Sequence, residues 1–145
     1  MLALARSFCG ILCILLFLGE ARAQSADSAH LPPETILLFV ASWCAPCHGE
    51  LAQLSEIGRG AQPYRILVVP FDDSRATRAM LNAVPAAQRW QPDRATQRSL
   101  AAEVERRSAG LPFSLVIDRD ARICAAHAEA LDAAKAAAMV SACRR

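Results

Sequence analysis

The sequence has little of the concentrated positive charge that binds nucleic acid. Its formal net charge is +2 over 145 residues, and lysine and arginine never occur more than two in a row. Nearly all of the positive charge is arginine, since Lys135 is the only lysine. Proteins that bind nucleic acid usually gather basic residues in a patch or a stripe. The scattered charge therefore argues against nucleic acid as a partner.

The N-terminal apolar run is too short to cross a membrane. It covers residues 8–18, whereas a spanning helix needs about 20 apolar residues. One arginine precedes the run, and the small-residue pattern Ala-Arg-Ala follows it at 21–23. This three-part arrangement is typical of a secretory signal peptide. We expect residues 1–23 to be a cleaved signal peptide, with an uncleaved membrane anchor as the alternative, and the mature protein to be periplasmic.

The rest of the chain has the length of one domain and shows no internal repeat. We expect residues 24–34 to be a flexible lead-in and residues 35–145 to be the folded domain. Two of the six cysteines lie in the expected signal peptide. Four remain in the mature chain, an even number that is compatible with disulfides in an exported protein: Cys44, Cys47, Cys124 and Cys143.

Two continuous apolar runs predict strands that are buried on both faces. They span residues 36–40 and 64–70, and each has the length of a strand. Between them, apolar residues recur at spacings of three, which predicts a helix over residues 44–57 that is ended by Gly58 and Gly60. A strand, a helix and a strand in this order form a βαβ unit, so the two strands should be parallel.

The next stretch predicts two further helices. Asp72 or Asp73 can cap a helix that runs to about Asn82, and Asp93 can cap another that is closed by Gly110. Residues 84–92 form a proline-punctuated connection between these helices. We expect Trp90 in this connection to be a packing residue, with a place at the border of the substrate groove as the alternative.

The end of the domain predicts a hairpin and a helix. The apolar run at 111–117 and a short strand around 122–124 flank a tight turn, so they should pair antiparallel. The final helix is expected over residues 130–142. Three of its residues are expected to face the core, namely Leu131, Ala138 and Met139.

Cys44 and Cys47 lie where the first expected strand turns into a helix. The unpaired N–H groups and the dipole at a helix N-terminus favour a thiolate over a thiol. The thiolate is the form that attacks disulfides. The two-residue spacing lets Cys47 resolve a mixed disulfide on Cys44. Pro46 has no N–H and suits the first helical turn, and Trp43 can shield one side of the pair.

Two segments resemble the thioredoxin superfamily, most closely its exported TlpA/DsbE-like branch. Residues 39–47 (FVASWCAPC) resemble the active-site segment of that family, and residues 110–118 (GLPFSLVID) resemble its cis-proline segment. The resemblance covers about residues 35–143. It implies a thioredoxin-like three-layer α/β/α sandwich with a minimal four-stranded mixed sheet in the order β-α-β-α-α-β-β-α.

The resemblance also implies the roles of the site residues. Cys44 would be the attacking thiolate and Cys47 the resolving thiol, in a motif completed by Trp43, Ala45 and Pro46. Pro112 would be cis and face the cysteine pair. The backbone of Leu111 would pair with the substrate chain like an added strand.

The implied function is disulfide exchange on exported cysteine-containing proteins. The dithiol carries the chemistry, so we expect no cofactor and no metal. We expect a monomer that receives electrons from a membrane thiol reductase and acts as a reductant. Two alternatives stay open: a DsbA-like oxidant served by a membrane oxidase, and a redox-inactive binding module of an export apparatus.

The sequence departs from the family at two positions that bear on function and turn geometry. Leu38 stands where thioredoxins often carry a buried acid that moves protons for the second cysteine, so the usual proton path is missing. Ala121 replaces the glycine that is common in the hairpin turn.

Other interpretations of the cysteines remain. Residues 44–48 also form a CXXCH string, typical of covalent haem attachment, with Met80 or Met139 as the distal ligand. The buried strand before the motif, Pro46 and the segment around Pro112 favour the dithiol instead. A purely structural disulfide would constrain little entropy, and a zinc site lacks its other ligands. For Cys124 and Cys143, a structural disulfide and two buried thiols are both left open.

Overall fold

The computed structural model describes residues 31–144, so the expected signal peptide and most of the lead-in lie outside the described residues. The elements are β1 (Thr35–Val40), α1 (Ala45–Ala52), α2 (Leu54–Gly60), β2 (Arg65–Pro70), α3 (Arg75–Leu81), the 3₁₀ turn η1 (Ala86–Gln88), α4 (Arg94–Arg107), β3 (Phe113–Ile117), β4 (Ile123–His127) and α5 (Ala133–Cys143). In this described part, no helix is both long and apolar enough to span a membrane.

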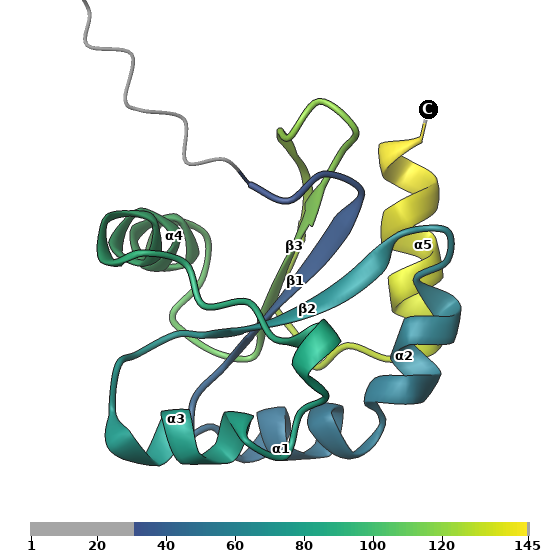
Figure 1. Ribbon diagram of the computed structural model, residues 1–145. Helices are drawn as coiled ribbons and strands as arrows, with labels where there is room; N and C mark the ends of the chain where they lie inside the picture. The colour runs from purple at the N-terminus through teal and green to yellow at the C-terminus, as the bar shows by residue number, and fades with distance from the viewer. Residues whose placement is uncertain (1–30, 145) are drawn as a thin grey trace, which may run out of the picture.

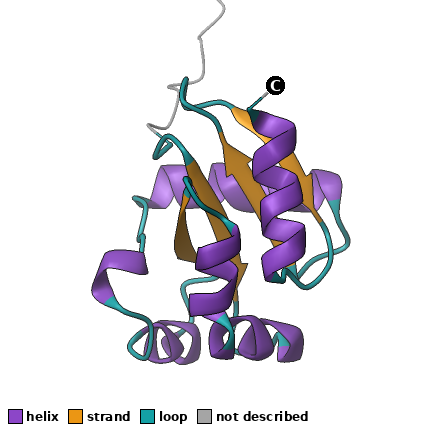
Figure 2. Cartoon of the chain, turned by 90° about the vertical axis from the view of Figure 1, so that its right-hand side faces the viewer, coloured by secondary structure: helices purple, strands orange, loops and turns teal. Residues whose placement is uncertain are grey.

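The strands form one mixed sheet in the order β2-β1-β3-β4. β1 pairs in parallel with β2 and antiparallel with β3, and β3 pairs antiparallel with β4. In Figure 1, α4 lies on one side of this sheet and α2 and α5 lie on the other. Figure 2 shows the α5 side from the front. The expected three-layer sandwich with a four-stranded mixed sheet, and its parallel and antiparallel pairings, are confirmed.

Each face of the sheet builds its own core because neighbouring side chains on a strand point to opposite faces. Leu37 and Phe39 pack with residues of α4, and the ring of Phe39 lies 6.3 Å from that of Phe113. Leu38 and Val40 pack on the other face, in a cluster that also contains both cysteines of the motif. The cysteine pair therefore belongs to the core between the sheet and the layer that contains α2 and α5.

The single helix expected over residues 44–57 is wrong in its continuity and its end. Gln53 interrupts it with a non-helical backbone conformation, so α1 and α2 are separate helices. α2 then continues to Gly60, so Gly58 does not end it. At Gly60 a Cβ atom would clash with the backbone of Ala133 at the start of α5. α2 does end at Gly60, as expected, and this glycine also allows two helices to approach closely.

The caps of the two helices after β2 agree with expectation in one case and differ in the other. α3 is capped by Ser74, whose Oγ accepts from Thr77 N at 3.1 Å, and not by Asp72 or Asp73. Asp72 is instead bonded to the backbone of Ser74 and to a tryptophan. α4 is capped by Asp93 as expected, with Thr96 N at 2.9 Å from its carboxylate.

The core face of α5 is shifted from the expected one. Leu131 and Met139 are buried, but Ala138 is exposed. Leu131 precedes the helix, which starts after its cap at Asp132, so a helical period counted from Leu131 gives the wrong face. Within the helix itself Ala136 and Val140 are buried with Met139.

Candidate active site

Cys44 is the N-cap of α1, and its sulfur lies at the unpaired N–H groups of the helix. Cys44 Sγ accepts a hydrogen bond from Cys47 N at 3.3 Å, and Pro46 occupies the first turn. The two cysteines are joined by a disulfide with a Cα–Cα distance of 5.4 Å. When the disulfide opens, the same N–H group and the positive end of the helix dipole stabilise a thiolate on Cys44.

The two sulfurs differ in how deeply they lie. Cys47 is completely buried, and its Sγ is 3.7 Å from the carbonyl oxygen of Phe39 on β1. Cys44 retains 3% exposure, and the two residues between the cysteines, Ala45 and Pro46, are exposed. A reacting group from outside therefore meets Cys44 first.

Trp43 is fixed beside the pair although it is 60% exposed, which makes it the one exposed large hydrophobic side chain in residues 31–144. Its Nε1 donates to Asp72 Oδ2 at 2.9 Å, and its ring meets that of Phe71 edge-on at 6.2 Å. Burial acts to raise the pKa of Asp72, but hydrogen bonds from Ser74, Thr77 and Trp43 outweigh it and hold the pKa below its usual range. The hydrogen bonds that lower the pKa of Asp72 favour its charged form, and this carboxylate accepts from the indole and holds it in place.

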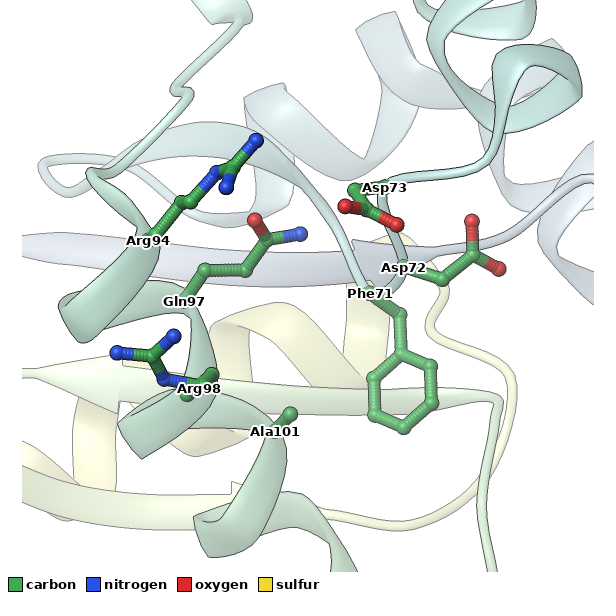
Figure 3. A pocket seen from close by; sticks show the side chains of 7 residues that line it. All are labelled: Phe71, Asp72, Asp73, Arg94, Gln97, Arg98 and Ala101. Carbon is green, nitrogen blue, oxygen red and sulfur yellow. The ribbon is translucent and has the colours of Figure 1, made fainter.

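A groove of about 330 Å³ adjoins the residues that hold Trp43. Figure 3 shows its lining: Phe71, Asp72 and Asp73 come from the segment after β2, and Arg94, Gln97, Arg98 and Ala101 come from α4. The segment after β2 contributes two carboxylates and α4 contributes two guanidinium groups, and Phe71 and Ala101 add apolar surface. The groove therefore offers contacts for a polar segment that approaches Trp43.

The second expected motif, at Leu111 and Pro112, contacts the core on the side of the cysteines. The Leu111–Pro112 peptide bond is cis. Leu111 is partly buried and packs against the core cluster that contains Cys44 and Cys47. Leu111 therefore packs against the same cluster as Cys44 and Cys47, from a segment distant in the sequence.

The residues named for haem binding, a metal site and the groove border are spread over several elements. His48 is exposed on α1, and its Nε2 is 3.0 Å from the carbonyl oxygen of Ser42. Met139 is buried in the core and Met80 packs against it. Across the described residues, no group of three or more His, Cys, Asp or Glu side chains is arranged to hold a metal ion. Trp90 is partly buried and packs against the core under α4.

Glu50 is a candidate site residue that the sequence analysis missed. It lies one turn after Cys47 on α1 and is 3% exposed. Its Oε1 accepts from Leu131 N at 2.7 Å. Burial raises the pKa of Glu50 to about 7, against the lowering effects of this hydrogen bond and of the charge on Lys135. A carboxyl group with this pKa exchanges protons near neutral pH.

A signal for Glu50 was present in the sequence. The buried residues of α1 and α2 are Cys47, Glu50, Leu54 and Ile57, which follow one another at spacings of three and four. The expected spacing of three also places Leu51 on the apolar face with Leu54 and Ile57, but Leu51 is only partly buried. A helical stripe counted from Cys47 would have placed an acid inside the core.

A second disulfide joins Cys124 on β4 to Cys143, the last residue of α5. The Cα–Cα distance is 5.5 Å, within the range that a disulfide spans. Cys143 packs against the core, whereas Cys124 is exposed on its strand. The bridge fastens the last helix to the edge of the sheet.

Comparisons with known proteins find relatives by shape only. No family model and no curated protein matches the sequence. The fold is similar to the crystal structure of the pneumococcal exposed lipoprotein thioredoxin Etrx1 from Streptococcus pneumoniae strain TIGR4, with a TM-score of 0.54, 18% identity, and coverage of 74% of this chain and 82% of that one.

Two further structures are similar to the same degree. The N-terminal domain of PilB from Neisseria gonorrhoeae has a TM-score of 0.54 and 18% identity, covering 79% of this chain and 81% of that chain. MTB DsbF, solved in mixed oxidized and reduced forms, has a TM-score of 0.52 and 18% identity, covering 74% and 78%. At this identity the likeness concerns the fold.

Proposed function

We propose that this chain, which has the thioredoxin fold, is an exported thiol–disulfide oxidoreductase that reduces disulfides of periplasmic proteins. The observation that carries the proposal is the position of Cys44 Sγ, which accepts the Cys47 N–H at the start of α1. A helix N-terminus favours the thiolate, and the thiolate is the attacking species in disulfide exchange. Cys47 lies behind it, buried and within bonding distance of the same sulfur.

The reaction proceeds in two exchanges. In the reduced protein the Cys44 thiolate attacks one sulfur of a substrate disulfide, which breaks that bond and releases the first substrate thiolate. Cys47 then loses its proton and attacks Cys44 Sγ in the mixed disulfide. The Cys44–Cys47 bond forms and the second substrate thiolate leaves. Two electrons have passed from the dithiol to the substrate, so a membrane thiol reductase must reduce the protein again.

Glu50 supports the second exchange because Cys47 has to lose a proton inside the core. Both side chains are buried, one helical turn apart on α1. With its pKa at about 7, the Glu50 carboxyl is partly ionised near neutral pH and can take the Cys47 proton. The buried acid of this fold thus comes from the helix rather than from β1, where Leu38 stands.

The substrate chain would lie across Trp43 and the segment at Leu111 and Pro112. Trp43 offers a rigid aromatic surface because Asp72 and Phe71 fix its ring. Leu111 packs against the cluster that contains both cysteines, which supports a substrate backbone being held there. We further propose that residues 1–23 direct export and that the domain works as a monomer.

The midpoint potential of the Cys44–Cys47 pair tests the direction of transfer. The protein is equilibrated with thiol–disulfide buffers and its free thiols are counted by alkylation and mass, with Cys44→Ser as the variant that lacks the pair. A value near that of thioredoxin, about −270 mV, supports a reductant, whereas a value near that of DsbA, about −120 mV, means an oxidant.

Insulin reduction in the presence of dithiothreitol tests whether the pair is active at all. The wild type should accelerate insulin precipitation and Cys44→Ser should not. A Cys124→Ser/Cys143→Ser variant is the matched control, since it also loses a disulfide but keeps the proposed site. If the wild type is as inert as Cys44→Ser, the chain is a binding module rather than an enzyme.

A further inference from the structure

Three buried polar atoms of the described residues have no hydrogen-bond partner: Glu50 Oε2, Ser114 Oγ and His127 Nε2. Buried polar atoms in proteins nearly always have a partner, and where no protein group is in reach the partner is usually a buried water molecule. If the three atoms lie in the same core layer, the same buried water molecules can serve as partners for all of them.

The two sheet residues are neighbours that point to the same face. Ser114 on β3 is paired in register with His127 on β4 and, on its other side, with Leu38 on β1. Residues paired across strands present their side chains on one face, with Cβ atoms about 5 Å apart. Leu38 belongs to the core cluster that contains Cys44 and Cys47, so Ser114 and His127 lie on the side of the cysteines.

Cys47 and Glu50 both lie next to the cross-strand row formed by Leu38, Ser114 and His127. Cys47 Sγ lies against the carbonyl oxygen of Phe39, the strand neighbour of Leu38. Glu50 reaches the same core from α1 and is bonded through Oε1 to Leu131 N, in the segment that follows β4. Its second oxygen is the unpartnered one. The three unpartnered atoms are thus in the core layer that holds the buried cysteine.

His127 differs from the other two because it connects the layer with the surface. Ser114 is completely buried and Glu50 nearly so, which leaves Glu50 without its own route to solvent. His127 is partly exposed although its Nε2 is buried. Histidine is the side chain suited to passing a proton between two partners near neutral pH, because each ring nitrogen can gain or lose one.

We propose that His127, with Ser114 and buried water, carries protons between Glu50 and solvent, so that the buried thiol of Cys47 can react. This inference rests on the proposed function. As Cys47 sulfur attacks Cys44 Sγ, its proton passes to the Glu50 carboxylate. The Glu50 carboxyl then gives the proton through water and the Ser114 hydroxyl to His127 Nε2, and His127 releases a proton to solvent. Glu50 and Ser114 end as they began, whereas His127 has given up the proton of Nδ1 and keeps the new one on Nε2. The reverse transfer restores its first tautomer when Cys47 regains a proton as the protein is reduced again. All three act as positioning residues for Cys47.

Few other charged groups can disturb this path. β1 and β3 carry no titratable side chain. α5 contributes Lys135, which is paired with Glu129, and its cap Asp132 is exposed and bonded to Lys135 N. On the helices that cover the row, α1 adds the exposed His48, and α2 adds Glu56 and Arg59, which pair with each other.

The test separates the two exchanges in one experiment. Reduced full-length protein is mixed with dithionitrobenzoate: attack by Cys44 releases one thionitrobenzoate, and resolution by Cys47 releases a second. The Cys47→Ser variant shows any release that other thiols contribute. In His127→Gln and Ser114→Ala, the first release should keep its rate, and the second should slow about tenfold at neutral pH. Added imidazole should restore the second rate in His127→Gln.

The choice of variants separates proton transfer from packing. Glutamine fills the place of His127 and keeps a hydrogen-bonding group, so a structural role would be preserved, but it cannot carry the proton. His48→Gln removes a histidine outside the row and should leave the second release unchanged. Unchanged second rates and pH profiles in both His127→Gln and Ser114→Ala would overturn the proposal. Absence of any second release in the wild type would instead contradict the proposed function.

Discussion

At the scale of single residues, Glu50 should make stability depend on pH. Its pKa is raised from 4.5 to about 7 in the folded protein, so the folded state holds this proton more tightly than the unfolded state. Below pH 4.5 Glu50 is protonated in both the folded and the unfolded state, so its ionisation does not lower the free energy of unfolding. As the pH rises to about 7 the protein loses about 3 kcal/mol of stability, because 1 pKa unit corresponds to about 1.4 kcal/mol.

Glu50→Gln tests this expectation because it keeps the oxygen that accepts from Leu131 N but cannot ionise. The variant should match the wild type near pH 4 and exceed its free energy of unfolding at pH 8 by up to about 3 kcal/mol. Urea unfolding at both pH values measures this difference in the free energy of unfolding. Glu105→Gln, at an exposed position on α4, is the control, and its stability relative to wild type should not change between pH 4 and pH 8. Parallel pH curves for Glu50→Gln and wild type would contradict a raised pKa.

Ala121 carries backbone strain in the hairpin turn. Its φ is +59°, a conformation that disfavours side chains with a Cβ atom. We expect Ala121→Gly to raise the free energy of unfolding by about 0.5–1 kcal/mol. Ala137→Gly, at an exposed position in α5, should lower it by about 1 kcal/mol. Chemical denaturation measures both, and a loss of stability in Ala121→Gly would show that the turn favours alanine.

Asp72 should matter for activity through Trp43 rather than through chemistry. Asp72→Ala removes the acceptor of the indole N–H, a hydrogen bond worth about 1 kcal/mol, so insulin reduction should fall about fivefold. The indole of Trp43 should also become more mobile, which fluorescence anisotropy in a Trp90→Phe background detects. Asp73→Ala removes a neighbouring exposed carboxylate that does not bind Trp43. Equal losses in the two variants would point to the acidic wall of the groove instead.

At the scale of elements, the attachment of α5 to the sheet rests on a covalent bond as well as on packing. The Cys124–Cys143 disulfide joins β4 to the end of α5 across 19 residues. A loop of this length lowers the entropy of the unfolded chain enough to contribute about 3 kcal/mol. We expect Cys124→Ser/Cys143→Ser to lose about that much in urea unfolding.

The same double variant should keep the potential of the proposed site. Cys44 and Cys47 are held by β1 and α1, which lie outside the bridged segment. Equilibration with thiol–disulfide buffers, followed by alkylation and mass measurement, should therefore give the wild-type midpoint potential for the Cys44–Cys47 pair. A shifted midpoint would show that the bridge and the proposed site are coupled through the core.

At the scale of the whole molecule, local signals predicted the order and pairing of elements. The apolar runs of β1 and β2 and the cap at Asp93 are each visible within a few residues, so they were found. The exposure of Ala138 was missed because Leu131 precedes the cap of α5, so a period counted from it gives the wrong face. The break at Gln53 was missed because the apolar spacing continues across it. The row of Ser114 and His127 depends on strand register, which no single segment reveals.

The two disulfides lie at opposite ends of helices, and this difference affects how easily each of them is reduced. Cys44 begins α1, where the positive end of the helix supports a sulfur anion, whereas Cys143 is the last residue of α5, at the negative end. Opening a disulfide must place negative charge on one of its sulfurs. The polarity of its helix therefore makes the first bond the easier one to open, although Cys124 of the second is exposed. Within one small domain, the two bridges therefore differ in how well their surroundings accept the charge that opening them creates.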